Sequence, residues 1–337
     1  MSKRNKNIPL VRRENVEFFA SLFEELDKKT YALLRESTIP LDIHDNPDYA
    51  YLPESCLKNF MEVLGESLSN DKLGVLFWRS CRETYVPKFV SLLTGGTTVR
   101  EALQEFSDLL KRESSGANVY LQKSGGSWWL VREKAGADEV WFKYAELFSV
   151  MCMAEVLRAL TDNAWRPTRI GVRSSDIEDF SSLPTLEQAQ FFAERPVTAL
   201  EIPEALLDEK AVITHTASQV FAANHYAEQS DDSFAATFKQ AITPYVSVGK
   251  LPIKLAAEIL RMNVRTLQRK LESEGIIYKT LIEEMVFDQI KHRLTSSSDS
   301  ITSIANKFGY SDAAHFSRSF KRITGLTPSH FRKHHRK

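Results

Sequence analysis

The stretch that decides the fold of the C-terminal part of the chain is Ile304-Ala305-Asn306-Lys307-Phe308-Gly309-Tyr310-Ser311. It predicts a helix from Ile301 to Phe308, a turn at Gly309-Tyr310, and a second helix with Ser311 as its N-cap. That helix is expected to reach about Thr324, because Gly325 is of the residue type favoured just past a helix end. Two short helices joined in this way form a helix-turn-helix unit, whose second helix often enters the DNA major groove.

The second helix of this unit divides into an apolar and a polar face. The inward positions are predicted to be Phe316, Phe320 and Ile323. The outward stripe is predicted to comprise Ser311, His315, Arg318 and Arg322. Further on, Thr327-Pro328 opens a last short helix that contains Phe331. The basic tail is expected either near phosphates or disordered, and consists of Arg332, Lys333, Arg336 and Lys337.

A second unit of the same kind precedes the first in the chain. A helix is predicted from Ile253 to Leu260, followed by a turn, Asn263 as N-cap, and a helix from Val264 to Glu274 that stops at Gly275. The positions predicted to be buried are Val264, Leu267 and Leu271. The polar face presents Arg265, Gln268, Arg269 and Glu272. Arginine can chelate the O6 and N7 atoms of guanine, and glutamine can pair with adenine, so this face suits the major groove.

A long helix predicted from Lys279 to Leu294 connects the two units. Its apolar stripe consists of Ile282, Met285, Val286, Ile290 and Leu294, and Ser296-Ser297-Ser298 breaks it. This helix is expected to fix the distance between the units. Either polar stripe alone could equally be a solvated helix face, but two units with a cap, a turn and a stop signal in the same order favour nucleic-acid binding.

Charge is divided unequally over the chain, although the net charge is zero. Residues 241–337 hold 17 Lys and Arg against 8 Asp and Glu, a charge of +9 that the acidic remainder balances. A basic C-terminal part behind an acidic N-terminal part is typical of a nucleic-acid-binding module attached to another domain.

With these residues, the C-terminal part of the chain, from about residue 233 to residue 337, resembles the AraC/XylS family of bacterial transcription regulators. The resemblance implies two recognition helices in successive major grooves on one face of the duplex, about 34 Å apart. The DNA-binding positions that it implies are Arg265, Thr266, Gln268, Arg269, Ala313, Ala314, His315, Arg318 and Arg322. Two features depart from the family. Val286 and Ile290 stand where relatives usually have Arg and Ala, which we interpret as local repacking. Ala313 and Ala314 lack polar groups, so the helix-turn-helix unit at 301–324 is expected to read thymine methyls or DNA shape.

The remainder of the chain is predicted to be an α+β domain, mostly helical with a small sheet. Strands are expected at 118–122 and 127–132, joined by a hairpin loop, and at 169–173 and 197–202. Long helices are expected at 53–68 and 141–160, and Thr97-Thr98 is expected to cap one at 99–110. The domains are therefore predicted to be 1–228, a linker at 229–233, and an all-α domain at 234–337 with two helix-turn-helix motifs.

This N-terminal domain resembles the arabinose-binding-like effector domain of ornithine-utilisation-type members of the AraC family. The segments that carry the resemblance are Asp45-Asn46-Pro47-Asp48, Asn70-Asp71-Lys72-Leu73-Gly74, the stretch from Thr97 to Leu103, and Trp165-Arg166-Pro167. It implies ligand sensing and self-association, without naming the ligand. Candidate effector-binding residues are Arg169, Arg173 and Trp129, whereas most of the other aromatic and Met residues from 128 to 153 are expected in the core.

The function predicted is that of a sequence-specific transcription regulator, an activator by resemblance, that binds double-stranded DNA as a homodimer and responds to a small molecule. RNA polymerase is the further expected partner. An enzyme is not expected, because the chain has no GxSxG, P-loop, GxGxxG or HExxH pattern. The alternative is a ligand-independent architectural DNA binder whose N-terminal half only dimerises.

No cofactor or metal site is expected. His44 has no second His or Cys at ligand spacing, and the three cysteines, Cys56, Cys81 and Cys152, are expected to be inert core residues. No apolar run is long enough to span a membrane, and the most apolar stretch, 147–160, is expected to be a buried helix. Without a signal sequence, the predicted location is the cytoplasm.

Overall fold

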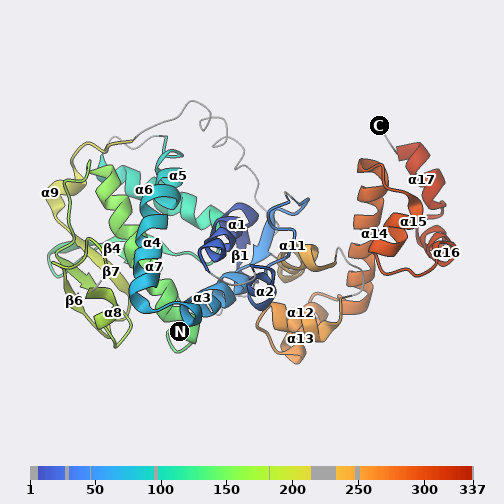
Figure 1. The fold of residues 1–337 in the computed structure, drawn as a ribbon, viewed down its shortest axis with the longest axis horizontal. Helices are drawn as coiled ribbons and strands as arrows, with labels where there is room; N and C mark the ends of the chain where they lie inside the picture. Colours follow the sequence, from blue (N-terminus) through green and yellow to red (C-terminus); the bar gives the residue numbers. More distant parts are fainter. Residues whose placement is uncertain are drawn as a thin grey trace. The chain divides into compact units, whose positions relative to one another are not determined.

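The computed structural model describes residues 7–26, 30–45, 47–94, 98–181, 183–213, 233–246 and 251–335. The chain divides into two compact units (Figure 1). Unit 1 consists of Met1–Leu10, Asn46–Ser55 and Ser230–Lys337, and unit 2 of Val11–Asp45 and Cys56–Gln229. The expected linker lies, apart from Ser233, outside the described residues, as do Thr97, Arg336 and Lys337.

Unit 2 is largely helical, as predicted. Its helices are α1 (Arg13–Ser21), η1 (Leu22–Glu25), α2 (Thr30–Glu36), α3 (Ser55–Ser67), α4 (Asn70–Ser80), η2 (Cys81–Tyr85), α5 (Val86–Val90), α6 (Val99–Glu113), α7 (Val140–Leu160), α8 (Glu178–Ser181) and α9 (Glu204–Leu207). Helix α3 begins at the boundary residue Ser55. Thr98 caps α6 in a reciprocal capping box with Glu101, so the predicted helix start is confirmed.

The sheet of unit 2 has five strands in the order β3-β4-β7-β5-β6. They are β3 (Val119–Ser124), β4 (Ser127–Arg132), β5 (Arg169–Gly171), β6 (Gln190–Phe192) and β7 (Thr198–Ile202). Only β5 and β6 pair in parallel among these strands. Gly125 and Gly126 alone make the hairpin turn, with φ of 59° and 80°, the left-handed conformations that a tight two-residue turn requires. Strand β6 was not predicted.

Helix α7 is the central helix of unit 2. It packs on strand β7 of the sheet and on α4, α5 and η2. Most of its side chains are buried, which confirms the buried-helix prediction for 147–160. The aromatic and Met residues of α7 belong to this core, among them Trp141, Phe142, Phe148, Met151 and Met153. Trp128 and Trp129 differ from them, because both are half-buried on β4.

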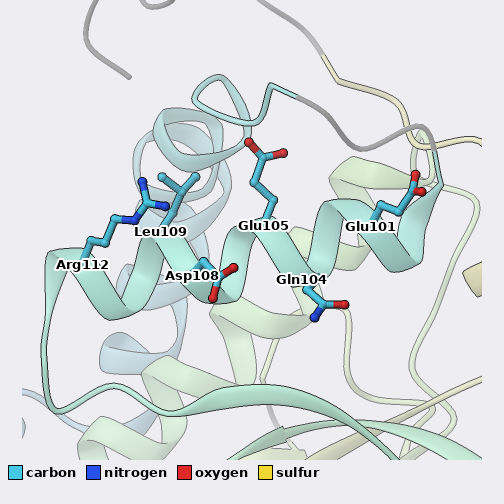
Figure 2. Close-up of a pocket in the computed structure, with 6 residues that line it drawn as sticks. All are labelled: Glu101, Gln104, Glu105, Asp108, Leu109 and Arg112. Atoms are coloured by element: carbon cyan, nitrogen blue, oxygen red, sulfur yellow. The ribbon is translucent and has the colours of Figure 1, made fainter. Parts of the chain in front are cut away.

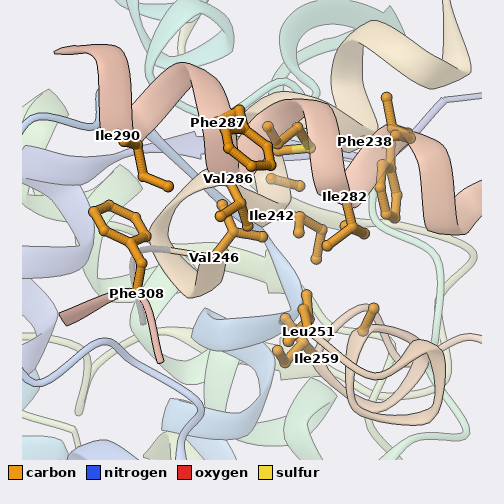
Figure 3. Close-up of a cluster of buried hydrophobic side chains, with 14 of the residues drawn as sticks. Phe238, Ile242, Val246, Leu251, Ile259, Ile282, Val286, Phe287, Ile290 and Phe308 are labelled. Atoms are coloured by element: carbon orange, nitrogen blue, oxygen red, sulfur yellow. The ribbon is translucent and has the colours of Figure 1, made fainter. Parts of the chain in front are cut away.

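Unit 1 is built on one apolar cluster that all its long helices share. These helices are α11 (Phe234–Val246), α12 (Ile253–Ile259), α13 (Val264–Glu272), α14 (Tyr278–Ser296), α15 (Ile301–Lys307), α16 (Ala313–Thr324) and α17 (Pro328–His335). Figure 3 shows side chains of α11, α12 and α14 converging on this cluster, with Phe308 at one end. Helix α11 was not predicted as a separate element.

Two N-terminal segments belong to this unit, although they lie within the predicted N-terminal domain 1–228. Ile8 and Leu10 are part of its apolar cluster. The Ile8 amide donates to Thr237 Oγ1 over 3.3 Å, and the Ser55 hydroxyl donates to the Ile259 carbonyl over 2.5 Å. Strand β2 (Tyr51–Pro53) packs on α11 and pairs with β1 (Leu10–Arg12), the strand in which the chain passes from unit 1 into unit 2. The two hydrogen bonds join residues 229 and 204 positions apart, which local sequence patterns do not reveal.

Across the described part of the chain, none of the helices is both long enough and apolar enough to cross a membrane.

A buried carboxylate in unit 2 ties α7 to the sheet. The side chain of Glu146 is fully buried. It accepts hydrogen bonds from the backbone amides of Arg173 (2.8 Å) and Ser174 (3.1 Å) and from the hydroxyl groups of Ser174 and Thr198. Charge-assisted hydrogen bonds of this kind offset the cost of burying the charge.

We therefore predict that Glu146→Ala destabilises unit 2 by about 3 kcal/mol, because it leaves buried donors without an acceptor. All five tryptophans lie in unit 2, so denaturant unfolding followed by tryptophan fluorescence reports on that unit. The control Glu187→Ala removes an exposed carboxylate and should change stability by less than about 0.5 kcal/mol. Equal effects of both substitutions would contradict the assigned role of Glu146.

Candidate nucleic-acid interface

The first helix pair, α12 and α13, is joined by a tight turn. Arg261 has a φ of 49°, and the Met262 amide donates to the Ala257 carbonyl over 2.8 Å. Asn263 caps α13 as predicted, because its side-chain oxygen accepts a hydrogen bond from the Arg265 amide over 2.8 Å. Leu267 and Leu271 are fully buried, while Val264 is half-buried. These contacts fix both the start and the rotation of α13.

The opposite face of α13 is exposed. Arg265, Gln268, Arg269 and Glu272 are all exposed, and Thr266 is half-buried. Among the described residues, no carboxylate lies within ion-pair distance of Arg265 or Arg269, so both guanidinium groups are available to an external acceptor. Lys270 lies to the side, with its Nζ 4.7 Å from the centre of the Phe234 ring. Burial, and then the nearby charge of Arg269, lower the pKa of Lys270.

The second helix pair, α15 and α16, has a different N-cap from the one predicted. The Ser300 hydroxyl caps α15, and Asp312, rather than Ser311, caps α16. The Asp312 carboxylate accepts from the amides of Ala314 (2.9 Å) and His315 (3.1 Å), satisfying two donors of the first turn at once. The turn therefore extends one residue further than expected, and α16 begins at Ala313.

Aromatic packing holds α16 in place. Phe316 and Phe320 are fully buried, with Tyr310 edge-on to Phe316 at 5.1 Å and Phe331 edge-on to Phe320 at 5.5 Å. Ile323, predicted to face inward, is 43% exposed. The prediction was wrong because α16 ends at Thr324, and the aromatic ring from α17 covers Phe320, one turn earlier.

The polar face of α16 is exposed at the positions predicted. Ala314, His315, Arg318 and Arg322 are exposed, and Ala313 is half-buried. An Arg322 nitrogen lies 3.9 Å from an oxygen of Glu283, in a pair that solvent surrounds. Within the described residues, Arg318 has no ion-pair partner. This face thus offers one free guanidinium, one imidazole and two methyl groups.

Helix α14 connects the two pairs and buries the whole predicted stripe, including Val286 and Ile290. Leu281 and Phe287 are also buried, so the helix is covered on more than one side. A groove of about 1010 Å³ runs beside α14. Its walls come from the start of α12 on one side and from the turn and polar face of the second pair on the other, including His315 and Arg322.

Arg332 has a structural role, contrary to the two alternatives considered for the basic tail. It lies in α17, and its Nε donates to the Leu294 carbonyl near the end of α14 over 2.9 Å. Lys333 in the same helix is exposed. The tail as far as His335 is therefore helical and attached to the core.

In unit 2, the structure brings together two of the three candidate effector-binding residues. Trp129 and Arg169 line one pocket of about 500 Å³ on the sheet. Arg173 lies elsewhere, where its guanidinium donates to the Lys134 carbonyl and lies 5.2 Å from the Phe142 ring centre. Sequence spacing alone did not reveal this separation, since the strand ends at Gly171.

A second hollow in unit 2, of about 350 Å³, follows the exposed side of α6 (Figure 2). Its lining has three carboxylates, Glu101, Glu105 and Asp108, against one guanidinium, that of Arg112, so it is net acidic. Two of these carboxylates already have structural partners, since Glu101 completes the capping box and Glu105 accepts from the amide and hydroxyl of Thr94. The charge of this surface is unsuited to a polyanion such as DNA.

The remaining candidate residues have ordinary structural surroundings. The three cysteines are free and buried, and burial raises the pKa of the Cys81 thiol well above its usual range, so it is held protonated. The Nδ1 atom of His44 lies 3.9 Å from a carboxylate oxygen of Glu17. Among the described residues, no group of three or more His, Cys, Asp or Glu side chains is arranged to hold a metal ion.

Comparison with known proteins finds similarity in the C-terminal part. Residues 256–334 match the model of a family described as a helix-turn-helix domain. The HTH-type transcriptional regulator VqsM of Pseudomonas aeruginosa is 36% identical over 76 residues, 23% of either chain. The raffinose operon transcriptional regulatory protein RafR of Pediococcus pentosaceus is 43% identical over 53 residues, 16% of this chain and 19% of that one. The chain thus matches less than a quarter of the length of these relatives.

Among solved structures, transcriptional regulator CdpR from Pseudomonas aeruginosa aligns over 94% of this chain and 98% of its own, with 18% identity and a TM-score of 0.40. The sequence match at 256–334 is the finding that bears on function. These residues form a helix-turn-helix domain, and they include α13 and α16 with their exposed polar faces.

The Asp312 cap should make the start of α16 sensitive to acid. The hydrogen bonds from the amides of Ala314 and His315 lower the pKa of Asp312 below its ordinary value of 3.8. Because the folded-state pKa is depressed, the stabilisation is present above the unfolded-state pKa and is lost as the pH falls through the folded-state pKa. We predict that, in the wild type, hydrogen-exchange protection of the amides at the start of α16 decreases once the pH is below 3.8.

The matched variant is Asp312→Asn, which keeps a good cap but does not titrate. Protection in the wild type relative to this variant, measured by exchange mass spectrometry, should be constant near neutral pH and should decline in acid. The same acid dependence in both proteins would show that another group is responsible.

Proposed function

We propose that the protein is a sequence-specific DNA-binding transcription regulator of the AraC type. The observation that carries the proposal is the repetition of one arrangement. Two capped helices, α13 and α16, each expose a polar face with at least one arginine that has no ion-pair partner among the described residues. Both helices are attached to one core through α14. The similarity of residues 256–334 to helix-turn-helix domains supports the same function.

The residues proposed to contact DNA are those of the two exposed faces. In α13 they are Arg265, Thr266, Gln268 and Arg269, with the arginines suited to guanine and Gln268 to adenine. In α16 they are Ala313, Ala314, His315, Arg318 and Arg322. The half-buried Thr266 and Ala313 would contact DNA only at the edge of the faces. The ion pair of Arg322 with Glu283 is exposed, and DNA phosphate would compete well for that guanidinium.

The remaining parts of the proposal concern the whole chain. It binds DNA as a homodimer, acts as an activator through RNA polymerase, and responds to a small molecule bound by unit 2. A ligand can shift the protein between two arrangements only if it binds one of them more tightly. The proposed domains are 1–228 and 234–337, with the addition that residues 7–10 and 47–55 pack with the C-terminal helices.

A ligand-independent architectural DNA binder is the alternative. It shares the exposed helices and differs in predicting the same DNA affinity with and without every metabolite. The pocket at Trp129 and Arg169 favours the ligand-responsive form.

We predict that Arg269→Ala weakens binding to the preferred DNA site by about 1–3 kcal/mol and relaxes the base preference at one position. The site is first selected from a random duplex library, and affinities are then measured for it and for random DNA at fixed salt. The control Arg112→Ala makes the same change in net charge on an exposed position of unit 2. An equal loss on selected and random DNA would exclude direct base readout by Arg269. His315→Ala is expected to have a smaller effect than Arg269→Ala.

We also predict that changing the spacing between the two recognition elements of the DNA site lowers the affinity of the protein for that site. We propose that α14 and the shared core hold α13 and α16 about one turn of DNA apart, or about 10 base pairs. Inserting about five base pairs places the second element on the opposite face, and inserting about ten doubles the distance. Both insertions should reduce affinity to that of a single element. Recovery with the ten-base-pair insertion would show that the two helix pairs move independently.

A further inference from the structure

We infer that the outer face of the five-stranded sheet in unit 2 binds a small organic carboxylate with a flat, unsaturated body. The pocket there has a volume of about 500 Å³ and lies over β3 to β7, with Gln122 and Ser124 of β3 as polar lining residues. Its regulatory meaning rests on the proposed function, which it deepens by naming the place and the chemical class of the ligand. The binding itself is independent of DNA.

The strand register creates the hollow. Val131 on β4 is opposite Ala199 on β7, which is opposite Gly171 on β5, which is opposite Phe192 on β6. The middle of this cross-strand row therefore has almost no side chain, while a phenyl ring stands at its end. Trp129, two residues from Val131 on the same face, forms the opposite wall. A sheet face with large rings around a small-residue floor is a preformed depression.

Two guanidinium groups stand over this depression, held against aromatic rings. That of Arg169 lies 5.6 Å from the centre of the Trp129 ring and 5.3 Å from that of Phe192. That of Arg195 lies 5.5 Å from the centre of the Phe192 ring. Cation–π contacts of this kind restrict the arginine side chains and keep their planar donors near the pocket.

The two arginines at the pocket differ in their ion pairing. Arg169 is paired with Glu201 at 3.1 Å. Arg195 has no carboxylate within ion-pair distance among the described residues. The pocket therefore has one excess positive charge, presented by a group that binds carboxylates with two parallel hydrogen bonds.

The position of Arg195 is fixed by the backbone as well. Its amide donates to the Val172 carbonyl over 2.8 Å, which attaches the segment before β7 to β5. A Cβ atom at position 171 would lie 3.3 Å from the Cγ atom of Arg195, so the glycine leaves room for the arginine stem beside the strand. Gly171 thus contributes both the floor of the pocket and the placement of its free cation.

The lining selects the body of the ligand. Aromatic and aliphatic groups form most of the wall, including Pro196 and Val197, and such a surface favours a flat apolar body beneath the charged group. The volume suits a metabolite rather than a polymer. A simple inorganic anion would satisfy Arg195 but would leave the rings uncovered.

The test measures binding to the full-length protein without DNA, by calorimetry, and uses matched probes. The carboxylates are benzoate, cinnamate and indole-3-acetate, their amides serve as uncharged counterparts, and inorganic phosphate serves as an anion without an apolar body. The variants are Arg195→Gln, which removes the free cation, and Gly171→Val, which fills the floor. The control is Arg82→Gln, because Arg82 also lies over a tryptophan ring, that of Trp78 at 5.3 Å, away from the pocket.

We expect one-to-one binding of at least one carboxylate and no binding of its amide. Arg195→Gln should weaken it about tenfold or more, while Arg82→Gln should leave it unchanged. Lack of carboxylate binding at about 1 mM would overturn the inference, as would equal binding of phosphate. It would also be overturned if neither Arg195→Gln nor Gly171→Val affected binding, or if they altered only self-association. Because Arg195 is exposed, Arg195→Gln should fold even if Gly171→Val does not.

DNA affinity of the ligand-free protein is measured separately. A protein that binds the carboxylate but no specific DNA would support the pocket and contradict the proposed function. A protein that binds specific DNA but none of the carboxylates would support the proposed function and contradict the pocket.

Discussion

The packing of α14 is the constraint on which the candidate DNA-binding surface depends. This helix buries Ile282, Val286 and Ile290 together with Leu281 and Phe287, so its apolar residues cover much of its circumference. A helix with only one apolar stripe could hold one neighbour, whereas this one is covered by α11, α15 and α17. Val286 and Ile290 are therefore part of the apolar core that α14 shares with these helices. Helices α13 and α16 contribute buried residues to the same core, so neither exposed face can turn without disturbing it.

Local signals in the sequence were enough to predict most of the helix-turn-helix part. Asn263 and Gly325 act through hydrogen bonds and backbone angles within a few residues, so their roles could be predicted without the fold. The cap of α16 was misassigned by one residue because Ser311 and Asp312 are both good caps, and only the length of the preceding turn decides between them. Ile323 has the right spacing for burial, but its exposure depends on where α17 packs.

The parts that could not be predicted depend on contacts between distant residues. Strand β6 is three residues long and lies at the edge of the sheet beside β5. It is too short to show the alternating apolar pattern that predicts a strand. The pocket on the sheet exists because Gly171 and Ala199 are opposite each other, and this register follows from neither strand alone. Trp129 and Arg169 could be chosen as candidates from residue type, but Arg195 could not, since it lies outside the strands and its place depends on the Val172 carbonyl.

The path of the chain has a consequence for how such proteins can exchange parts. The boundary between units is crossed after Leu10, Asp45, Ser55 and Gln229, and Ile8 and Leu10 are buried in the same cluster as Phe320. A recombination event with a single junction near residue 230 would give a hybrid whose C-terminal helices meet a foreign N-terminal segment in their core. Viable hybrids would have to carry matching sequences at both ends. Residues 7–10 and the C-terminal helices that they pack against are therefore expected to change together in evolution, although most of the chain separates them.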